Sequence, residues 1–342
     1  MSPRILVTGA TGFVAGHCIA ELLRAGYRVR ATVRDLDAAH RRAHLTALGG
    51  DLEFVAADLG FDTGWAAAAH GVDGVLHVAS PFPSAPPKHE DDLIRPAVDG
   101  TLRVLRAAAD AGVRRVVQTS STAAIAYGHP DSGVRTEADW TVVSKATAYP
   151  KSKTLAERAA WDFAAAHPDG PELVVLNPGI ILGPLLGTAT STSHEPIRRL
   201  LTREMPGMPR VTWAPVDVRD LAVAHRLALE TPAAAGNRYI CAGDPLTLPE
   251  IARLLAAEFG PLGYRIPSRT IPDFVVRAVA LVDRSVALTV PNLGMRELVS
   301  ADKVRAELGW DMRPVRESVV DTAESLIRAG IVPAPAGGFV SA

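Results

Sequence analysis

Short runs of apolar, often β-branched residues alternate with longer segments rich in Ala, Leu and Arg through the first 180 residues. The short runs are continuously apolar, which is typical of strands covered on both faces. The predicted strands are Arg4–Thr8, Arg28–Val33, Leu52–Ala56, Gly74–Val78, Arg114–Thr119 and Leu173–Asn177. The predicted helices between them are Phe13–Ala25, Asp37–Leu48, Asp92–Ala111 and Lys151–His167. This alternation predicts an α/β fold, a Rossmann-type doubly wound parallel sheet with right-handed crossovers.

After Pro178 the pattern is less regular, and Pro and Gly become frequent. The expected helices are Pro196–Arg203, Asp217–Glu230, Leu248–Phe259 and Glu317–Ala329, and the expected strands are Arg210–Val216 and Arg238–Cys241. The segments Pro81–Lys88 and Gly183–Pro196 are predicted to be loops. We therefore expect residues 1–180 to form a Rossmann domain, to which residues 211–241 or so return, and residues 181–342 to form mainly a smaller C-terminal α/β lobe.

Composition and charge exclude several classes of protein. With 48% hydrophobic and 21% charged residues the chain can bury a full core, so it is not disordered. Lys and Arg total 36 against 37 for Asp and Glu, and this net charge of −1 gives no electrostatic case for a nucleic acid or an anionic membrane as partner. Two cysteines, Cys18 and Cys241, cannot form a disulfide framework or a cysteine-based zinc site, which favours a reducing cytoplasm.

Targeting segments are also not expected. The first apolar run is too short for a signal peptide. The uncharged stretch Leu173–Ser193 is long enough to span a bilayer, but Asn177, Pro178, Pro184 and three glycines favour a buried strand followed by a loop. We expect a soluble, cytoplasmic protein that is a monomer or a homodimer.

The first predicted strand runs directly into two glycines three residues apart, Gly9 and Gly12. Glycines let the backbone turn sharply and let a pyrophosphate approach the next helix, whose free N–H groups and dipole favour an anion. Ala15 holds the third small position, where helix and strand pack closely. This pattern predicts a dinucleotide-binding loop, whose cofactor contacts are expected from Gly9, Thr11, Gly12, Phe13 and Val14.

The second predicted strand ends in Val33-Arg34-Asp35. NAD-binding proteins usually place an acidic residue at this strand end, whereas an arginine fork pairs with the 2′-phosphate of NADP. Arg34 therefore favours NADP(H), although Asp35 could reach the ribose if the register shifted by one residue. Arg41 and Arg42 are either a second phosphate contact or ordinary surface arginines.

Other strand ends supply weaker candidates for cofactor contacts. Asp58 and Leu59 follow the third strand and could approach the adenine. Small residues follow the fourth strand, where they would leave room for the cofactor backbone. The further contacts predicted at the fourth and fifth strand ends are Val78, Ala79, Ser80 and Thr119.

Tyr149 and Lys153 lie four residues apart, so they share one face if this segment opens a helix. Lys153 could then lower the pKa of the phenol and hold the nicotinamide ribose. Tyr149 could donate its proton to a carbonyl oxygen as hydride arrives at carbon. Ser121, at the end of the fifth strand, is the predicted third member, with Ser120 and Thr122 as rivals because successive strand residues face opposite sides.

Eight motifs carry a resemblance to a known family: TGATGFVAG (8–16), VRD (33–35), HVASP (77–81), TSSTAA (119–124), YPKSKTLAERAAWDF (149–163), LNPGIILGP (176–184), PVDVRDLAVAH (215–225) and ELGW (307–310). They resemble the extended short-chain dehydrogenases/reductases, and among them the dihydroflavonol-reductase-like aldehyde and ketone reductases, including the methylglyoxal-reductase type. The resemblance implies NADP(H), a Ser–Tyr–Lys set, a nicotinamide lined by Pro178 to Ile181, and a C-terminal lobe closing over the substrate. Thr147 and Ala148 depart from the plant cinnamoyl-CoA reductase pattern before the tyrosine, which counts against that activity.

Most of the remaining candidate functional residues are expected to serve the fold and not the chemistry. No metal site is expected, because His40 and His44 lack a third ligand. His77 is expected inside a strand, and Trp161 and Phe163 in a helix core. A helix N-terminus held by salt bridges is expected at Asp217, Arg219 and Asp220. The residues that could wall a substrate pocket are Phe82, Ile125, Tyr127 and Trp213.

The leading interpretation is a reversible NADPH-dependent reduction of a small aldehyde or ketone, with Tyr149 as proton donor. An NAD-dependent nucleotide-sugar epimerase or dehydratase is the first alternative, and Arg34 argues against it. A non-catalytic NADP-binding regulator is the second, and the presence of both Tyr149 and Lys153 argues against that.

Overall fold

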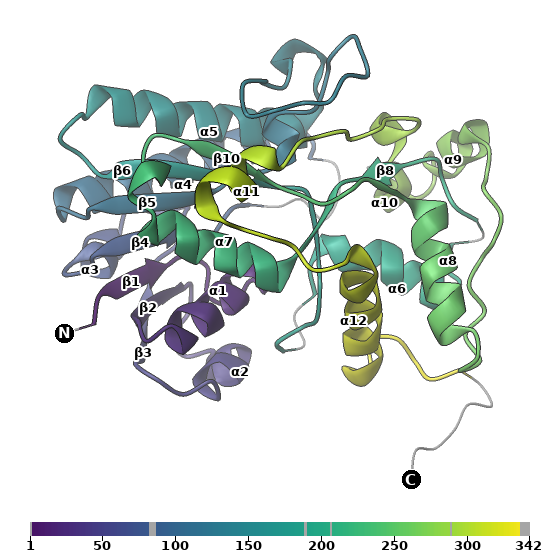
Figure 1. Ribbon diagram of the computed structural model, residues 1–342, viewed down its shortest axis with the longest axis horizontal. Coiled ribbons are helices and arrows are strands. Elements are labelled where there is room, and N and C mark those ends of the chain that lie inside the picture. Colours follow the sequence, from purple (N-terminus) through teal and green to yellow (C-terminus); the bar gives the residue numbers. More distant parts are fainter. Residues whose placement is uncertain (1, 82–86, 188–189, 206, 288, 336–342) are drawn as a thin grey trace.

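The computed structural model describes residues 2–81, 87–187, 190–205, 207–287 and 289–335. At its centre is a seven-stranded sheet in the order β10-β6-β5-β4-β1-β2-β3, in which every neighbouring pair is parallel (Figure 1). Its strands are β1 (Arg4–Val7), β2 (Arg28–Val33), β3 (Leu52–Ala56), β4 (Gly74–His77), β5 (Arg115–Thr119), β6 (Glu172–Pro178) and β10 (Arg238–Cys241). The predicted α/β fold with a doubly wound parallel sheet is confirmed.

Helices cover both faces of this sheet. One face carries α1 (Phe13–Arg24), α2 (Ala43–Thr46), α7 (Val218–Glu230) and α11 (Asp302–Leu308), and the other carries α3 (Trp65–Ala69), α4 (Asp91–Asp110) and α5 (Ala148–Ala166). Neighbouring strand residues enter different cores: Leu6 packs with Leu105 beneath α4, and Val7 packs with Ile19 on α1. Because both faces of the inner strands are buried, β1, β4 and β6 are mostly apolar, whereas the edge strand β3 is only half-buried.

The chain reverses its winding direction between β1 and β4, which lie side by side in the sheet. The loops that leave these two strands are joined by Thr8, whose Oγ1 accepts hydrogen bonds from the amides of Val78 (3.0 Å) and Ala79 (2.9 Å). In open α/β sheets the ligand crevice lies at this point, outside the carboxyl ends of the strands.

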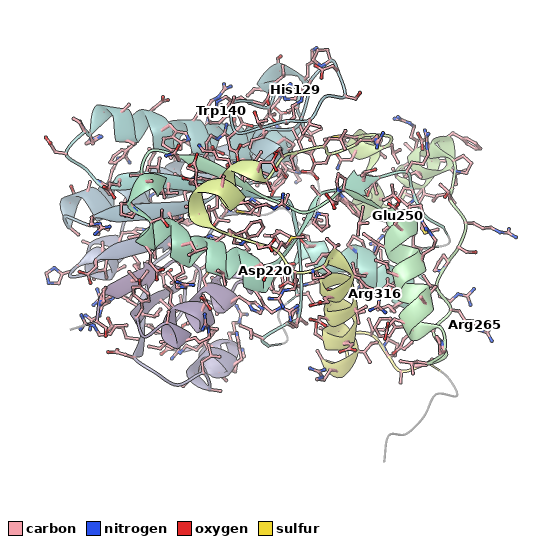
Figure 2. All side chains as sticks on the ribbon, in the orientation of Figure 1. His129, Trp140, Asp220, Glu250, Arg265 and Arg316 are labelled. Carbon is pink, nitrogen blue, oxygen red and sulfur yellow. The ribbon has the colours of Figure 1, made fainter. Side chains whose placement is uncertain are left out.

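A second group of elements packs around its own apolar core, which includes Leu200, Leu255 and Leu326. We call it the C-terminal lobe. Its helices are α6 (Glu195–Leu201), α8 (Leu248–Phe259), α9 (Asp273–Val279), α10 (Arg284–Ala287) and α12 (Val315–Arg328), and its strand pair is β8 (Thr212–Trp213) with β11 (Leu246–Thr247). Figure 2 shows Glu250 on α8 and Arg316 on α12, away from the seven-stranded sheet.

Two short strands, β7 (Ile180–Leu182) and β9 (Pro215–Asp217), form a parallel pair where the chain passes between the sheet and the lobe. Short 3₁₀ turns complete the described structure: η1 (Ala39–Arg42), η2 (Thr122–Ala124), η3 (Val143–Lys145), η4 (Thr192–His194), η5 (Pro232–Ala234) and η6 (Val290–Asn292). In the part of the chain that the structure describes, no helix is long and apolar enough to cross a membrane.

Three predicted elements differ most from the observed ones, and the other predicted helices and strands agree within two residues at each end. The helix expected at Asp37–Leu48 is broken into η1 and α2, where Leu45 is the one buried residue, so there is no apolar face to sustain a longer helix. The strand expected at Arg210–Val216 is two strands, β8 and β9, which pair with different partners on either side of Ala214. Helix α5 begins three residues before the predicted start, because a proline such as Pro150 fits the first helical turn.

Candidate active site

The loop after β1 requires glycine at position 9. Gly9 has φ +73°, and a Cβ there would lie 2.9 Å from the Cβ of Ala79, so a side chain would push the loop off the end of β4. The next glycine, Gly12, is the N-cap of α1, and no side chain caps this helix end within the described residues. The amides of the first turn, which include those of Phe13 and Val14, are therefore available to an anion.

Arg34 follows β2 and is exposed beside a cavity lined by Thr11, Val33, Arg34, Asp35, Ala38, Arg41 and Arg42. Neither Arg34 nor Arg41 forms a salt bridge with a carboxylate of the described residues. Arg42 is already engaged, because it donates to the carbonyl of Leu36. The Asp35 carboxylate accepts from the Asp37 amide at 2.8 Å within its own turn. Three arginines and one aspartate thus line the cavity, and two of the arginines form no ion pair within the described residues.

Asp58 and Leu59 lie at the same carboxyl edge but engage other parts of the protein. The Asp58 carboxylate accepts from the Gly60 amide at 2.7 Å. Leu59 packs tightly against Gly100 on α4. Neither residue lines either of the two cavities described for this edge.

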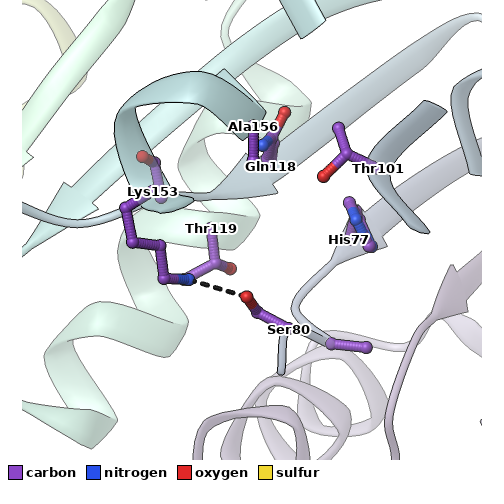
Figure 3. Close-up of a pocket in the computed structure, with 9 residues that line it drawn as sticks. His77, Ser80, Thr101, Gln118, Thr119, Lys153 and Ala156 are labelled. Carbon is purple, nitrogen blue, oxygen red and sulfur yellow. Dashed lines mark hydrogen bonds between the residues drawn. The ribbon is translucent and has the colours of Figure 1, made fainter. Parts of the chain in front are cut away.

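A second cavity lies between the ends of β4 and β5 and the side of α5 (Figure 3). It is lined by His77, Ala79, Ser80, Thr101, Gln118, Thr119, Ser120, Lys153 and Ala156. The buried Lys153 ammonium donates to the Ser80 hydroxyl at 3.0 Å, which closes the cavity on one side. Four of the predicted cofactor contacts, Ala79, Ser80, Thr119 and Lys153, are therefore brought together here, and Val78 adjoins them.

Tyr149 occupies the first turn of α5, so it lies one turn before Lys153 on the same face. Burial raises the pKa of Tyr149 to about 12, and a hydrogen bond from the Ser121 side chain opposes this rise. An ionised Glu297 would add to the rise. The Ser121 oxygen itself accepts from the Ala123 amide at 3.1 Å, which leaves its proton for Tyr149. The phenol is thus held in its neutral, proton-donating form.

Lys153 is buried, and burial lowers its pKa to about 8, while the carboxylate of Glu157 opposes that fall. Glu157 lies one further turn along α5 and is fully buried. Its partners are Ser120, which donates to it, the Asn177 amide at 2.7 Å, and Arg238 at 2.7 Å. The buried Glu157 carboxylate has several hydrogen-bonding partners, and its negative charge favours the charged form of Lys153.

The two rivals of Ser121 point elsewhere. The hydroxyl of Ser120 is used by Glu157, and that of Thr122 is directed to Glu297 and the carbonyl of Pro178. Of the three hydroxyl groups that follow β5, that of Ser121 contacts Tyr149.

Thr119 is fixed by a histidine that sequence reasoning did not identify. The buried His225 of α7 contacts Thr119 Oγ1 through Nε2 (2.7 Å) and the Leu221 carbonyl through Nδ1 (2.8 Å). Burial lowers the pKa of His225 to about 4, so the ring is neutral and Nδ1 carries the proton for the carbonyl. Thr119 therefore donates to Nε2, and its oxygen can still accept a hydrogen bond within the cavity.

The residues named as possible substrate walls fall in different environments. Ile125 is fully buried in a small apolar core with Ala214 and Ile240, and it lines neither of the two cavities described above. Tyr127 and Trp213 are half-buried, and Phe82 lies outside the described residues. Pro178 ends β6, and Ile181 lies in β7, paired with Val216.

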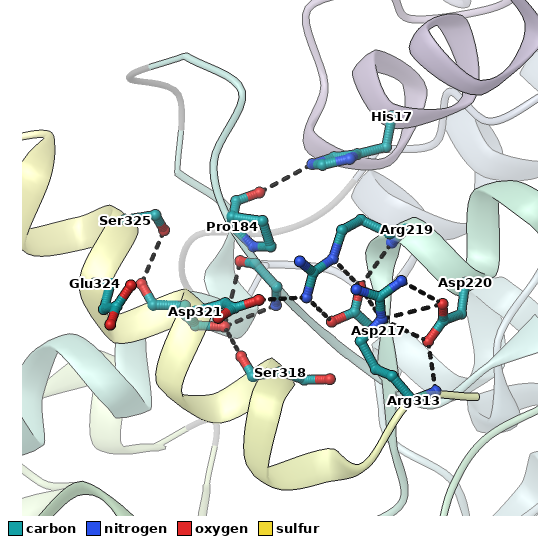
Figure 4. Close-up of polar contacts among 12 residues, drawn as sticks. His17, Pro184, Asp217, Arg219, Asp220, Arg313, Ser318, Asp321, Glu324 and Ser325 are labelled. Carbon is teal, nitrogen blue, oxygen red and sulfur yellow. Dashed lines mark hydrogen bonds and ion pairs between the residues drawn. The ribbon is translucent and has the colours of Figure 1, made fainter. Parts of the chain in front are cut away.

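Asp217 has the structural role expected from the sequence. It caps α7 by accepting from the Arg219 amide at 2.8 Å, and the Arg219 guanidinium bridges it to Asp321 on α12 at 2.6 Å (Figure 4). Arg313 pairs with Asp220 at 2.7 Å. These ion pairs join the sheet domain to the C-terminal lobe.

The two histidines considered as metal ligands are not brought together with a third ligand in the described residues. His40 and His44 lie on different short helices, and the described residues contain no group of three potential metal ligands. His77 is buried and bonded to Thr8 Oγ1 at 3.0 Å, as expected for a strand residue.

Sequence reasoning also missed two carboxyl groups near the site. Glu157 could have been found, since Tyr149, Lys153 and Glu157 follow one another at intervals of four residues on one helix face. Glu297 could not, because it lies far along the chain and reaches the site only through the tertiary fold.

A doubly wound sheet with an open helix N-terminus at its switch point, and with a neutral phenol beside a buried ammonium, defines the class of the dinucleotide-dependent oxidoreductases of the extended short-chain type. A family model, the NAD dependent epimerase/dehydratase family, matches residues 5–242, and the chain belongs to that family. The resemblance to extended short-chain dehydrogenases/reductases is therefore confirmed.

Individual relatives are reductases. The chain is 36% identical to cinnamoyl-CoA reductase 1 of Petunia hybrida over 341 residues, which cover 97% of this chain and 94% of that protein. It is 35% identical to the (2S)-flavan-3-ol-forming anthocyanidin reductase of Vitis vinifera over 282 residues, or 77% and 82% of the two chains. The structure of yeast methylglyoxal/isovaleraldehyde reductase with NADPH is similar at a TM-score of 0.80 and 26% identity, with 95% and 98% of the chains covered.

Proposed function

We propose that this protein is an NADPH-dependent reductase that converts a small aldehyde or ketone into the alcohol, reversibly. The observation that carries the proposal is the arrangement on α5 and the end of β5: Tyr149 is hydrogen-bonded by Ser121, and Lys153 lies one turn away and reaches Ser80. A proton donor, a fixed cation and a second hydroxyl thus converge at the ligand crevice of the sheet.

The residues present fit a dinucleotide. The positive φ of Gly9 and its close approach to Ala79 hold the loop after β1 tightly against the end of β4, with no Cβ between them. The uncapped start of α1 supplies amides for a pyrophosphate, with Thr11, Gly12, Phe13 and Val14 beside it. Val78, Thr119, Pro178 and Ile181 are proposed to line the nicotinamide, and Asp58 and Leu59 to lie toward the adenine.

Support for NADPH over NADH comes from Arg34 and Arg41. Both are without a carboxylate partner in the described chain and line one cavity, and guanidinium groups pair well with a phosphate dianion. The Asp35 carboxylate accepts a hydrogen bond within its own turn, so it is already engaged and is not directed to a ribose 2′-hydroxyl. This favours a cofactor that carries a 2′-phosphate.

NADPH, when bound, supplies the hydride that reaches the carbonyl carbon. Tyr149 gives its phenolic proton to the carbonyl oxygen, which becomes the hydroxyl of the product. Lys153 stabilises the phenolate by its charge, and Ser121 shares the negative charge that develops on oxygen. Glu157 favours the charged form of Lys153, because its carboxylate opposes the larger effect of burial on the ammonium.

The substrate is proposed to enter between the sheet edge and the C-terminal lobe, with Tyr127 and Trp213 beside it. The two curated relatives bear the names of a cinnamoyl-CoA and an anthocyanidin reductase, and the yeast structure is named for methylglyoxal and isovaleraldehyde. Thr147 and Ala148 before Tyr149 disfavour the thioester, so we expect a free aldehyde or ketone.

The test is NADPH consumption by the purified protein across aliphatic aldehydes, diketones, ketoesters and a cinnamoyl-CoA thioester. We expect turnover with free carbonyls, faster with NADPH than with NADH. If no carbonyl is reduced, the proposal is wrong. Tightly bound NAD together with turnover of a nucleotide sugar would instead identify an epimerase or dehydratase, and a stable protein partner without turnover would identify a regulator.

A further inference from the structure

A segment from the C-terminal lobe crosses to the end of the central sheet just before α11. At one end of it Arg296 pairs with Thr212, the first residue of β8 in the lobe. At the other end Val299 pairs with Arg135, in the loop that follows β5 and η2. Residue 297, between these two attachments, therefore has a position fixed from both sides.

Glu297 places a carboxyl group inside the protein at this crossing. The residue is 4% exposed. Thr122 Oγ1 contacts Oε1, and the Ala214 amide donates to Oε2 at 3.3 Å. No arginine or lysine of the described residues lies within salt-bridge distance of it, in contrast to the buried Glu157 and Asp217, which are paired with arginines.

A buried carboxylate without a cation is costly, whereas a buried carboxylic acid is not. Burial accordingly raises the pKa of Glu297, and the hydrogen bonds from Thr122 and Ala214 oppose the rise. The titratable groups that feel its charge are the phenols of Tyr127 and Tyr149, each of which would become harder to ionise beside a carboxylate.

The hydrogen-bond geometry around Glu297 also favours its protonated, neutral form. Thr122 Oγ1 lies against Glu297 Oε1 and also 3.3 Å from the carbonyl oxygen of Pro178, and both of these are acceptors if Glu297 is ionised. One hydroxyl has a single proton and cannot serve both. When Glu297 is protonated, its own O–H donates to Thr122, and the Thr122 proton is free for Pro178.

Thr122 is the residue directly after Ser121, so whatever fixes the Thr122 side chain fixes the backbone that carries Ser121. We infer that Glu297, as the neutral carboxylic acid, is a positioning residue that holds Ser121 against Tyr149 through Thr122, and that leaves the reacting phenol without a negative neighbour. This inference rests on the proposed function for its catalytic part and on the contacts of Glu297 for its protonation.

The protonation can be tested without activity. As pH rises through the usual carboxyl pKa of about 4.3, the unfolded chain loses its proton at position 297 and the folded protein keeps it. Wild type should therefore lose stability relative to Glu297→Gln, by about 2 °C in melting temperature per pH unit between about pH 4.5 and the folded pKa. Glu324→Gln, on the exposed side of α12, is the control and should run parallel to wild type. If wild type gains stability relative to Glu297→Gln as pH rises, or the two curves are parallel, Glu297 is not held as the acid.

The positioning can be tested by steady-state kinetics with one aldehyde substrate. Glu297→Ala should lower kcat about 10-fold with little change in the KM for NADPH, and Glu297→Gln should restore most of the loss because an amide can also donate to Thr122. Thr122→Val should resemble Glu297→Ala, and the double variant should be no slower than either. If Glu297→Gln and Glu297→Ala lose kcat equally, the role belongs to a carboxylate and not to the neutral acid. If the losses of Glu297→Ala and Thr122→Val add in the double variant, or if Glu297→Ala keeps wild-type kcat, Glu297 does not position Ser121. If the wild type reduces no carbonyl, the proposed function fails, and the melting curves still decide the protonation.

Discussion

The Lys153 ammonium donates to the Ser80 hydroxyl across 3.0 Å and so joins the second turn of α5 to the end of β4. This contact places the positive charge of Lys153 beside the loop that follows β4, which is itself hydrogen-bonded to the loop that follows β1. Because Tyr149 precedes Lys153 by one turn, the same helix carries the proton donor to that place. The following predictions test this arrangement and the cofactor site beside it.

Tyr149→Phe should lower kcat about 10²- to 10⁴-fold, because the ring is kept and the transferable proton is lost. NADPH affinity, measured by quenching of protein fluorescence, should change little. Tyr27→Phe, which removes a phenol bonded to Glu230 at the surface, is the control and should keep wild-type rates. An active Tyr149→Phe enzyme would show that another group donates the proton.

Reduction should slow as pH rises above about 8. The folded pKa of Lys153 is about 8, below its usual value, so the ammonium is present below that pH and is lost above it. Lys153→Arg retains its charge at all these pH values, so the activity that remains in this variant should not fall near pH 8. A pH profile of kcat for both proteins checks this, and an identical alkaline fall in both would assign the titration to another group.

Arg34→Ala should reduce kcat/KM for NADPH about 10- to 100-fold, since a charge-assisted hydrogen bond to phosphate contributes about 1.5–3 kcal/mol. The value for NADH should not change, because NADH lacks the 2′-phosphate. Arg253→Ala removes an exposed guanidinium on α8 and serves as the matched control. Equal losses with both cofactors would mean that Arg34 does not select the phosphate.

Gly9→Ala and Gly26→Ala form a matched pair, with φ of +73° and +84°. A Cβ at Gly26 meets nothing within 4 Å, so that variant should lose only the ~1–2 kcal/mol of the left-handed conformation. At Gly9 the Cβ also meets Ala79 at 2.9 Å, so this variant should unfold at lower urea and bind NADPH more weakly. Urea unfolding and cofactor titration measure the two effects, and equal losses in both variants would show that the contact with Ala79 is unimportant.

The sequence predicts the central sheet well because its inner strands are buried on both faces, as Leu6 and Val7 show by entering separate cores. Tyr149 and Lys153 are predictable because their spacing matches one helical turn. The short strands β7 and β9 were not predicted as a pair, since three residues are too few to display a period.

The hydrogen-bonding partners of the site residues are harder to predict from the sequence. Ser120, Ser121 and Thr122 are equivalent in sequence, and the distinction among them arises from Glu157 and Glu297, which approach from α5 and from the C-terminal lobe. Such tertiary contacts leave no local pattern in the chain.

The ion pairs between α7 and α12 have a mechanical consequence. The Arg219 guanidinium forms ion pairs with both Asp217 and Asp321. A small movement of one carboxylate away from the guanidinium therefore leaves the other ion pair in place. Coulomb attraction weakens gradually with distance, whereas close apolar packing is lost within about an ångström. The electrostatic part of this junction therefore falls off gradually with displacement, and it weakens as ionic strength rises around the partly exposed arginine.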